Sequence, residues 1–328
     1  MGNKIRIGIC GFGRLGKGVQ TELDKNNDME LSAIFTRRAA SGLPGAKPGV
    51  KVVQTDLAHE WKDKVDVVIL CGGSASDLPS QGPYYAKIFN TVDSYDTHAK
   101  ASAYYASVDS SAKESGNISI ISVGWDPGLF SLMRLYMGAA TPLGQTYSFW
   151  GKGVSQGHSE AIRGIEGVLD AVQYSIPAED AINRVRNGEN PKLSKRETHA
   201  RLCYVATAEN ADLNKIEKTI KEMPDYFLDY DTTVHFISLD ELKANHGKLP
   251  HGGYVIHNGA TGENNRQMLE FSLKLDSNPE FTASILIAFA RAAYRMSQNG
   301  EVGARTIFDI PPKLLSPQSP EQLIVDLL

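Results

Sequence analysis

The sequence predicts an α/β protein, with an N-terminal doubly wound parallel sheet and a second α+β domain built on a mixed or antiparallel sheet. Three observations predict this fold class. Strand-like apolar segments alternate with helical stretches through the first third of the 328 residues, and a glycine-rich turn follows the first segment. After Gly124 the alternation gives way to apolar segments that follow one another without room for a helix between them. Parallel strands need such crossovers, whereas antiparallel strands do not.

The first domain is expected to contain six strands. Val65 to Cys71 is almost continuously apolar, which is typical of a strand covered on both faces. The predicted strands span residues 4–10, 31–35, 50–53, 65–71, 90–94 and 118–123. Helices are expected at 14–25, 83–89 and 99–115, the first from the spacing of Leu15, Val19 and Leu23 on one face.

The second domain is expected to begin near Asp126-Pro127, where Asp can cap a helix and Pro can occupy its first position. Apolar segments predict strands at 146–150, 202–206, 233–238, 253–257 and 268–275. Helices are expected at 159–174, 178–187, 211–222 and 279–298. The segment 187–198 and the tail from Pro311 have the composition of linkers.

These patterns predict two domains. Residues 1–122 are expected to bind a dinucleotide, and the tail at about 300–328 packs back on them in this prediction. Residues 123–299 are expected to form the second domain.

Composition and charge exclude several classes of protein. With 34 basic and 38 acidic residues, the net charge of −4 does not favour binding to nucleic acid or to an anionic membrane. The chain has three cysteines without a CxxC pair and no HExxH, so neither a disulfide framework nor a zinc site is indicated. No apolar segment is long enough to span a bilayer, and the N-terminus lacks the pattern of a signal peptide. We therefore expect a cytoplasmic protein without a metal.

The segment from Gly11 to Gly16 fits the G-x-G-x-x-G pattern directly after a strand and at the start of a helix. Gly11 permits the tight turn, Gly13 lets backbone N–H groups approach a pyrophosphate, and Gly16 lets helix and strand pack closely. The same residues begin a P-loop pattern, but Gly18 stands where a P-loop needs Ser or Thr. The context favours a Rossmann-type dinucleotide site.

The end of the second strand indicates which dinucleotide binds. An NAD site places Asp or Glu there for the ribose 2′-hydroxyl, whereas this chain has Thr36, Arg37 and Arg38. Guanidinium groups bind a phosphate bidentately, so these residues suit a 2′-phosphate. The sequence therefore predicts NADP.

Nine segments along essentially the whole chain resemble the meso-diaminopimelate dehydrogenase family. The most specific are VGWDPG, FWGKGVSQGHSEAIR and LPHGGYVI; the others are GFGRLG, FTRR, LCGGSASD, TVDSYDTH, MPDYF and LKLDSNPEFTAS. The resemblance implies reversible NADP-dependent oxidative deamination at the D-centre of meso-2,6-diaminopimelate, in a pathway of lysine biosynthesis. It also implies a homodimer whose second domain holds the substrate and the dimer contacts. The cofactor contacts that it implies are Gly11, Phe12, Gly13, Arg14, Leu15, Gly16, Thr36, Arg37, Arg38, Cys71, Gly72, Ser74 and Ala75.

Two acidic segments follow the strands where a nicotinamide should lie. Asp93 and Asp96 follow the fifth strand, and Trp125 and Asp126 follow the sixth. Carboxylates at this place can hold an ammonium group and assist the attack of water on an iminium. The resemblance implies that Asp96, Trp125 and Asp126 contact the D-centre, with Asp96 and Asp126 in catalytic roles, although each Asp could also simply cap a helix.

The resemblance assigns a second group of residues to the L-amino-acid end of the substrate. It contains Ser175, Arg201, His251 and an Asn that aligns best with Asn265, with Asn264 as the alternative. Trp150 and Gln156 match the lining of the family's pocket. Ser175 stands where the family usually has Thr, and Glu160 where it commonly has Asp, so the pocket of this chain is expected to be looser.

Two other functions are compatible with parts of the pattern. One is another oxidoreductase of the same architecture, such as a homoserine dehydrogenase or a dihydrodipicolinate reductase, against which the WDPG and PHGG segments argue. The other is a protein that binds NADPH as a redox sensor without turnover, against which the acidic and basic candidate site residues argue.

Overall fold

The apolar segments of the first third of the chain form one parallel sheet in the computed structural model, which describes residues 4–38, 43–263 and 265–328. Within these ranges the sheet has seven strands, and each neighbouring pair is parallel. In sheet order they are β14 (Gly303–Arg305), β6 (Ile118–Ile120), β5 (Asn90–Asp93), β4 (Val67–Leu70), β1 (Ile5–Cys10), β2 (Met29–Thr36) and β3 (Lys51–Gln54). The predicted doubly wound fold is confirmed, and β14 is an added strand that the sequence did not indicate.

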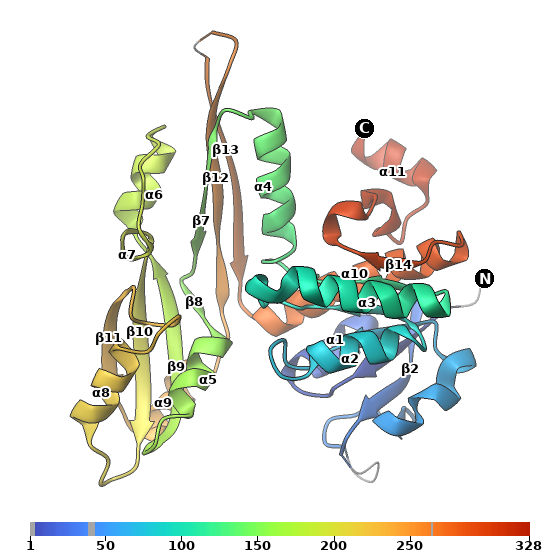
Figure 1. Ribbon diagram of the computed structural model, residues 1–328, viewed down its shortest axis with the longest axis horizontal. Helices are drawn as coiled ribbons and strands as arrows, with labels where there is room; N and C mark the ends of the chain where they lie inside the picture. The colour runs from blue at the N-terminus through green and yellow to red at the C-terminus, as the bar shows by residue number, and fades with distance from the viewer. Residues whose placement is uncertain (1–3, 39–42, 264) are drawn as a thin grey trace. The chain divides into compact units, whose positions relative to one another are not determined.

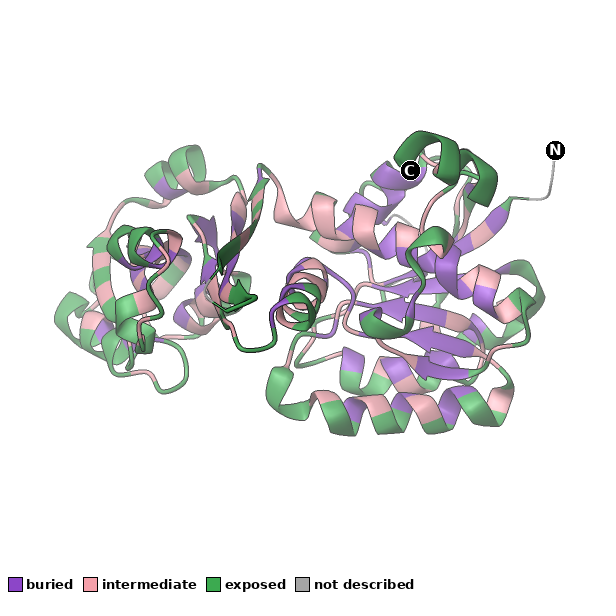
Figure 2. Cartoon of the chain, turned by 90° about the horizontal axis from the view of Figure 1, so that it is seen from above, coloured by how far each residue is buried: buried purple, intermediate pink, exposed green. Residues whose placement is uncertain are grey.

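Helices cover both faces of this sheet (Figure 1). On one face α1 (Arg14–Leu23) and α10 (Asn278–Gln298) share a core with alternate strand residues such as Ile7 and Ile9. On the other face α2 (Leu78–Ala86) and α3 (Ala101–Ser115) pack on Phe35 and Leu70. Successive strand residues point to opposite faces, so both faces must be apolar. Figure 2 shows the central strands of this sheet as largely buried, as the burial of every residue of β4 and β6 requires.

The C-terminal segment returns to the sheet after α10. Gly303 N donates to Asn117 O at 2.8 Å, and Ile121 N donates to Arg305 O at 2.9 Å, which seats β14 beside β6. The short elements of this part are η1 (Thr55–Lys64), η2 (His98–Lys100), η3 (Ile307–Asp309), η4 (Pro312–Leu314) and α11 (Pro320–Leu327). The tail from Pro311 therefore contains helical turns, although its composition is that of a linker.

The chain divides into two compact units. The first contains Met1–Leu132 and Pro279–Leu328, and the second contains Met133–Asn278. The boundaries fall in the first turns of α4 (Leu129–Ala140) and at the start of α10. Residues 123–132 and 279–299 therefore group with the first unit, because the apolar face of α10 contributes Ala283, Leu286 and Phe289 to the core beneath the parallel sheet.

In the described part of the second unit the strands form two sheets instead of the single one expected. The first is mixed: β11 (Asp231–Phe236) is parallel to β10 (His199–Thr207), which is antiparallel to β9 (Val168–Pro177), itself antiparallel to β8 (Gly153–Val154). The second is antiparallel, in the order β13 (Asn265–Leu275), β12 (His251–Thr261) and β7 (Gln145–Trp150). The helices of this unit are α5 (Gln156–Arg163), α6 (Glu179–Arg186), α7 (Lys195–Thr198), α8 (Leu213–Lys221) and α9 (Leu239–His246).

Three predicted helices are wrong in their bounds. The helix expected at 83–89 spans Leu78–Ala86 as α2. The helix expected at 159–174 ends at Arg163, and after Gly167, whose φ is +87°, the chain continues as β9. Residues 168–177 pair with both β8 and β10, so this apolar segment forms a strand in place of a helix. The helix expected to start at Asp126-Pro127 starts at Leu129, because Trp125 and Gly128 form a bridge that closes a turn over these two residues.

None of the helices formed by the described residues is long and apolar enough to cross a membrane.

Candidate active site

The glycine-rich turn has the backbone geometry that the sequence predicts. Gly11 adopts a φ of +90°, where an L side chain would be strained, and its N–H donates to Phe35 O at 3.0 Å. A Cβ on Gly16 would overlap the carbonyl oxygen of Gly11. Gly13 precedes α1 without a side-chain cap, and a Cβ there would meet no atom within 4 Å. The N-terminus of α1 therefore presents its backbone N–H groups to an open space, which suits a pyrophosphate.

Other residues of this turn differ in exposure. The side chain of Phe12 is buried in the core and that of Leu15 packs against it, so these residues can approach a dinucleotide only through their backbone. Arg14 is exposed in the first turn of α1.

The predicted 2′-phosphate residues lie at the carboxyl end of β2. Thr36 is buried and its Oγ1 accepts a hydrogen bond from Arg38 N at 3.1 Å. Arg37 and Arg38 are exposed, and Arg37 forms an ion pair with Asp77 at 2.9 Å. Both guanidinium groups therefore stand at the surface, where a phosphate can replace or extend the Arg37–Asp77 pair.

The loop after β4 is joined to the loop after β5. Ser74 Oγ accepts a hydrogen bond from Asp96 N at 2.9 Å and lies 3.2 Å from Thr97 Oγ1. Cys71 N donates to Cys10 O at 2.7 Å, which extends the pairing of β1 and β4 by one residue. Gly72 and Ala75 belong to the same loop. The structure thus brings Ser74, a candidate cofactor residue, against the backbone of Asp96, a candidate catalytic residue.

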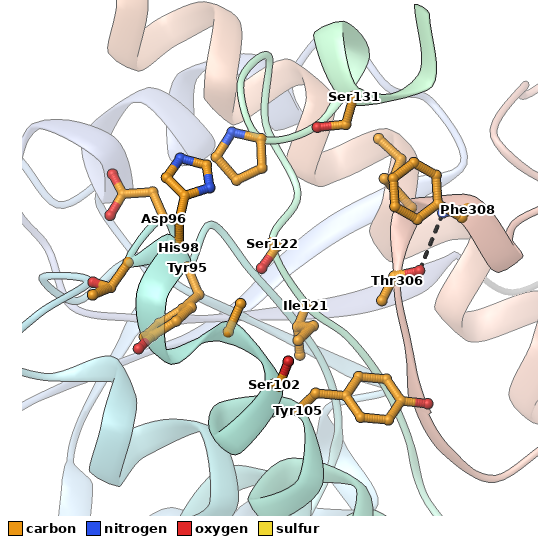
Figure 3. Close-up of a pocket in the computed structure, with 14 residues that line it drawn as sticks. Tyr95, Asp96, His98, Ser102, Tyr105, Ile121, Ser122, Ser131, Thr306 and Phe308 are labelled. Atoms are coloured by element: carbon orange, nitrogen blue, oxygen red, sulfur yellow. Dashed lines mark hydrogen bonds between the residues drawn. The ribbon is translucent and has the colours of Figure 1, made fainter. Parts of the chain in front are cut away.

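A pocket of about 450 Å³ lies at the carboxyl ends of β5, β6 and β14 (Figure 3). Asp96, Ser122 and Ser131 contribute polar groups to its lining, and Tyr105 and Phe308 contribute rings. Asp96 is exposed at the pocket, and Pro127 of the Asp126-Pro127 turn lines another part of it. The structure therefore brings the segment after β5 and the segment after β6 to one cavity, as the parallel sheet requires.

Trp125 and Asp126 occupy the turn before α4. Trp125 is 8% exposed and packs edge-on against Phe130, with 5.2 Å between the ring centroids. Asp126 is half-buried. Trp125 therefore belongs largely to the core of the first unit, and only a small part of the residue is open to a ligand.

In the second unit, Arg201 is a buried cation. It is 6% exposed, its Nη1 donates to Ser175 Oγ at 2.6 Å, and its guanidinium carbon lies 3.8 Å from the centroid of the Tyr230 ring. Arg201 and Ser175 are paired across β10 and β9, which fixes their contact. Burial lowers the pKa of the Arg201 guanidinium from its usual value.

Arg201 has no carboxylate within 4.0 Å among the described residues, and its Nε has no hydrogen-bond partner there. A buried cation without a counter-ion is costly, so structural arginines at such depth are normally paired. Arg291 in the first unit illustrates the usual case, because Asp28 accepts from its Nε at 2.6 Å. Arg201 is therefore suited to bind an anionic group of a ligand.

His251 lies close to this pair through β8. Gly153 is paired with Ser175, and a Cβ on Gly153 would overlap the ring of His251. Nδ1 of His251 lies 2.8 Å from Gly252 N and 3.3 Å from Gly252 O. Ser175, Arg201 and His251 therefore gather around β8.

Trp150 packs on His199, a residue that the sequence analysis did not single out. The rings are stacked with 5.0 Å between their centroids, and Trp150 N donates to His199 Nε2 at 2.8 Å. Burial, together with the charge of Arg201, lowers the pKa of His199 to about 4. Trp150 is 36% exposed, and Gln156 is exposed at the start of α5.

Asn265 is not brought to this group. It pairs with Thr261 at one end of the β12–β13 hairpin, whereas His251 pairs with Leu275 at the other end. At about 3.3 Å per residue, roughly 30 Å separates the two ends. Asn264 lies outside the described residues. Asn278 takes a more suitable place, because its N–H donates at 3.0 Å to Leu249 O, two residues before His251. The segment LKLDSNPEFTAS contains Asn278 and could have pointed to it.

Comparisons with known proteins point to one family. A profile of the diaminopimelic acid dehydrogenase C-terminal domain matches residues 124–277. A meso-diaminopimelate D-dehydrogenase from Ureibacillus thermosphaericus is 60% identical over 326 residues, which cover 99% of this chain and 100% of that protein. An engineered D-amino acid dehydrogenase solved with NADP⁺ is 42% identical, with a TM-score of 0.89 over 99% of this chain and 100% of that chain.

A third similar protein is a mutant meso-diaminopimelate dehydrogenase from Clostridium tetani, solved with diaminopimelate. It is 52% identical, with a TM-score of 0.94 over 99% of this chain and 100% of that chain. Its six substitutions replace a Gln, a Thr, an Arg, a Pro, a His and an Asn. The spacing between these six positions is the same as that between Gln156, Ser175, Arg201, Pro250, His251 and Asn278 in this chain.

Proposed function

The chain belongs to the meso-diaminopimelate D-dehydrogenase family, and we propose on this premise which of its residues act on the substrate and on the cofactor. The family's reaction is the reversible, NADP-dependent oxidative deamination of meso-2,6-diaminopimelate at its D-centre. In the proposed reaction the ammonium group would give up a proton and the D α-carbon would give up a hydride to the nicotinamide. The iminium formed in this way would take up water and release ammonia, which leaves L-2-amino-6-oxopimelate. NADP, when bound, supplies the hydride acceptor.

In this proposal Asp96, Trp125 and Asp126 contact the D-centre. The two carboxylates orient the ammonium group and then assist the attack of water on the iminium, for which a nearby acceptor of the water proton is needed. The position of Asp96 in the pocket after β5, joined through Ser74 to the loop after β4, supports this role. The exposed part of Trp125 would cover the reacting carbon and exclude bulk water.

Arg201, Ser175 and His251 bind the L-amino-acid end in this proposal. The observation that carries it is the buried guanidinium of Arg201, which has no carboxylate within 4.0 Å among the described residues and so is matched to the carboxylate of a ligand. Ser175 Oγ already orients Arg201 Nη1, and an N–H of the His251 ring can donate to the same carboxylate. Holding the far end of the substrate fixes the geometry at the reacting carbon.

We further propose Asn278, in place of Asn265, as the Asn of this end. Its hydrogen bond to Leu249 and the matched spacing of the six positions in the Clostridium tetani protein support the assignment. Gln156 belongs to the same matched set and, with Trp150, would line the pocket along the substrate's carbon chain.

The cofactor residues of the proposal belong to the first unit. Backbone N–H groups at Gly13 and in the first turn of α1 would bind the pyrophosphate, and Thr36, Arg37 and Arg38 would bind the 2′-phosphate. The loop from Cys71 to Ala75 would cover the nicotinamide half. We accordingly propose the first unit as the nucleotide-binding domain and the second as the domain for substrate and dimer contacts.

A homodimer in the cytoplasm completes the proposal. The family resemblance supports the dimer. The compartment is supported by the reactants, a free amino acid and NADP.

The experiment that tests this function is NADPH formation by the purified protein with meso-diaminopimelate and NADP⁺. The L,L isomer, D-alanine and NAD⁺ serve as controls. We expect turnover with the meso isomer and NADP⁺ only, because one centre must be D for hydride loss and the other must be L for Arg201 and its neighbours. Turnover with D-alanine would show that the L-end contacts are dispensable. Binding of NADPH without turnover of any substrate would instead support a sensor.

A further inference from the structure

Asp93 is a buried carboxylate that the proposed chemistry does not use. It is the last residue of β5 and is 1% exposed. Burial raises the pKa of its carboxyl to about 6, although the hydrogen bonds that the carboxylate accepts lower this pKa in part. Keeping an acidic group at this depth costs free energy, so the group needs either a structural or a functional reason.

The carboxylate of Asp93 accepts hydrogen bonds from three different segments. Oδ1 accepts from Tyr95 N at 2.9 Å and from Ser122 N at 3.1 Å. Oδ2 accepts from Tyr104 Oη at 2.6 Å. The loop after β5, the turn after β6 and helix α3 therefore meet at one side chain.

Each of these three segments carries part of the pocket wall. Tyr95 directly precedes Asp96, and Ser122 is three residues before Trp125. Tyr104 on α3 lies beside Tyr105, which lines the pocket (Figure 3). The Tyr104 ring stacks on Tyr95 at 4.0 Å between centroids, so this loop and this helix are fixed to each other a second time.

The turn at Ser122 needs an outside partner to hold its shape. Ser122 has a φ of +58°, a left-handed conformation that is unfavourable for a residue other than glycine. The hydrogen bond from its N–H to Asp93, together with that from Val123 N to Asp93 O at 2.8 Å, stabilises this conformation. The path of the chain into Trp125 and Asp126 thus depends on Asp93.

We propose that Asp93 is a positioning residue of the dehydrogenase reaction, whose carboxylate holds the segment bearing Asp96 and the segment bearing Asp126 in one fixed arrangement. The inference rests on the roles proposed above for Asp96 and Asp126. Asp93 touches no reacting atom, and it acts by setting where these two carboxylates stand. A displacement of about 1 Å at such groups is enough to slow a reaction on the order of a hundredfold.

The test is Asp93→Asn, which keeps the shape of the side chain. The substitution replaces the charged carboxylate by a neutral amide, whose oxygen is a weaker acceptor and whose NH2 group would face a donor such as Tyr104 Oη. We expect kcat with meso-diaminopimelate to fall at least about tenfold. The dissociation constant of NADPH, followed by fluorescence, is expected to stay within about twofold, because the proposed phosphate contacts lie at Gly13, in the first turn of α1 and at residues 36–38, at the end of β2 and after it. A kcat within about threefold of wild type would overturn the proposal.

Thr91→Val is the matched control. Thr91 Oγ1 donates to Ser119 Oγ at 2.8 Å, between the same two strands and at the same 1% exposure, but it contacts neither loop. We expect this variant to lose stability and keep its kcat. If Asp93→Asn and Thr91→Val had equal melting temperatures and lost kcat equally, Asp93 would contribute only to the stability of the fold, and the inference would be contradicted.

Tyr104→Phe decides the question if Asp93→Asn does not fold. It removes one donor and leaves the carboxylate, and we expect kcat to fall on the order of three- to fivefold with an unchanged affinity for NADPH. An unchanged kcat would overturn the proposal. Asp96→Asn and Asp126→Asn are measured alongside. If both variants retained full activity, the roles proposed for Asp96 and Asp126 would fail, and the inference about Asp93 would fail with them. If only these two variants lost activity, the proposed function would stand and the positioning role of Asp93 would be excluded.

Discussion

At the scale of single residues, Arg201 shows how far a residue type can be interpreted before its surroundings are known. The sequence places an Arg near an apolar segment, which is equally typical of a strand end at the surface. The structure buries the guanidinium between Ser175 and the Tyr230 ring. Its depth and its lack of a carboxylate among the described residues are tertiary facts, and they give the residue its proposed role.

We predict that Arg201→Ala lowers kcat/KM for meso-diaminopimelate by on the order of two to four decades, since a charge-assisted contact to the substrate carboxylate is lost. Steady-state kinetics measures this. Arg186→Ala is the control, because Arg186 also lies over an aromatic ring, that of Tyr254 at 4.6 Å, but is paired with Glu270. A near-normal kcat/KM for Arg201→Ala would remove Arg201 from the site.

The pair Arg37 and Arg38 leads to a prediction about the cofactor. We expect the double change to Ala to raise KM for NADP⁺ by on the order of tenfold or more and to affect KM for NAD⁺ much less, because only NADP⁺ carries the 2′-phosphate. Lys51→Ala is the control. Lys51 is an exposed cation at the start of β3, whereas Thr36 pairs with Gln54 at the end of that strand, so this variant should change neither KM. An equal effect on both cofactors would argue against the 2′-phosphate assignment.

His199 leads to a pH prediction. Its pKa is about 4 in the folded protein, against about 6.5 in an unfolded chain, so the unfolded state binds more protons between these values. Stability is then complete above about pH 6.5 and falls as the pH drops toward 4. Between pH 7 and 4.5, we expect wild type to lose about 2 to 3 kcal/mol more than His199→Gln in urea unfolding. Equal losses would mean that protonation of His199 is not coupled to unfolding.

At the scale of elements, the long hairpin decides between two asparagines. Because β12 and β13 pair residue by residue from His251–Leu275 to Thr261–Asn265, a residue near the turn cannot be near His251. A sequence alignment does not contain the distance between the two ends of the hairpin. The first residue of α10, by contrast, is tied to the segment that leads into His251.

We therefore predict that Asn278→Ala raises KM for meso-diaminopimelate by about tenfold, the cost of one hydrogen bond to a charged group. Asn265→Ala should leave KM within about twofold. Kinetics of both variants with saturating NADP⁺ checks the prediction. The reverse order of effects would restore Asn265 to the site and exclude Asn278.

The misassigned helix at 159–174 has a cause at the same scale. Its apolar residues fit a helical period in part, but Gly164 and Gly167 interrupt it, and the residues that follow find hydrogen-bond partners on β8 and β10. Short apolar segments serve strands and helices alike, and the neighbouring strands decide.

At the scale of the whole molecule, the C-terminal segment completes the first unit. It supplies β14 at the edge of the parallel sheet and the buried side chains of Ala304, Ile307 and Ile310. The following helix α11 has no buried residue. The two parts of the tail should therefore differ in their contribution to stability.

We predict that deleting residues 300–328 lowers the free energy of unfolding by at least about 5 kcal/mol, since a strand pairing and three buried apolar side chains are lost. Deleting residues 320–328 alone should change it by less than about 1 kcal/mol. Chemical denaturation of both truncated chains measures the difference. Similar stability of the longer truncation and of wild type would contradict the contribution assigned to β14.

The sequence by itself determined the fold class, the six strands of the first domain in their order, the preference for NADP and the family. It could do so because each of these features depends on residues that are close together in the chain. They are an apolar strand followed by glycines, two arginines at a strand end, and segments such as WDPG and PHGG in a fixed order.

Only the tertiary structure decided which of these residues meet. It grouped Ser175, Arg201 and His251 around β8, separated Asn265 from them, brought the C-terminal segment to the edge of the parallel sheet, and joined three pocket segments through Asp93. The physical reason is that burial, strand register and hydrogen-bond partners are set by residues distant in the chain. A side chain acquires its depth and its neighbours only when those distant residues have packed around it.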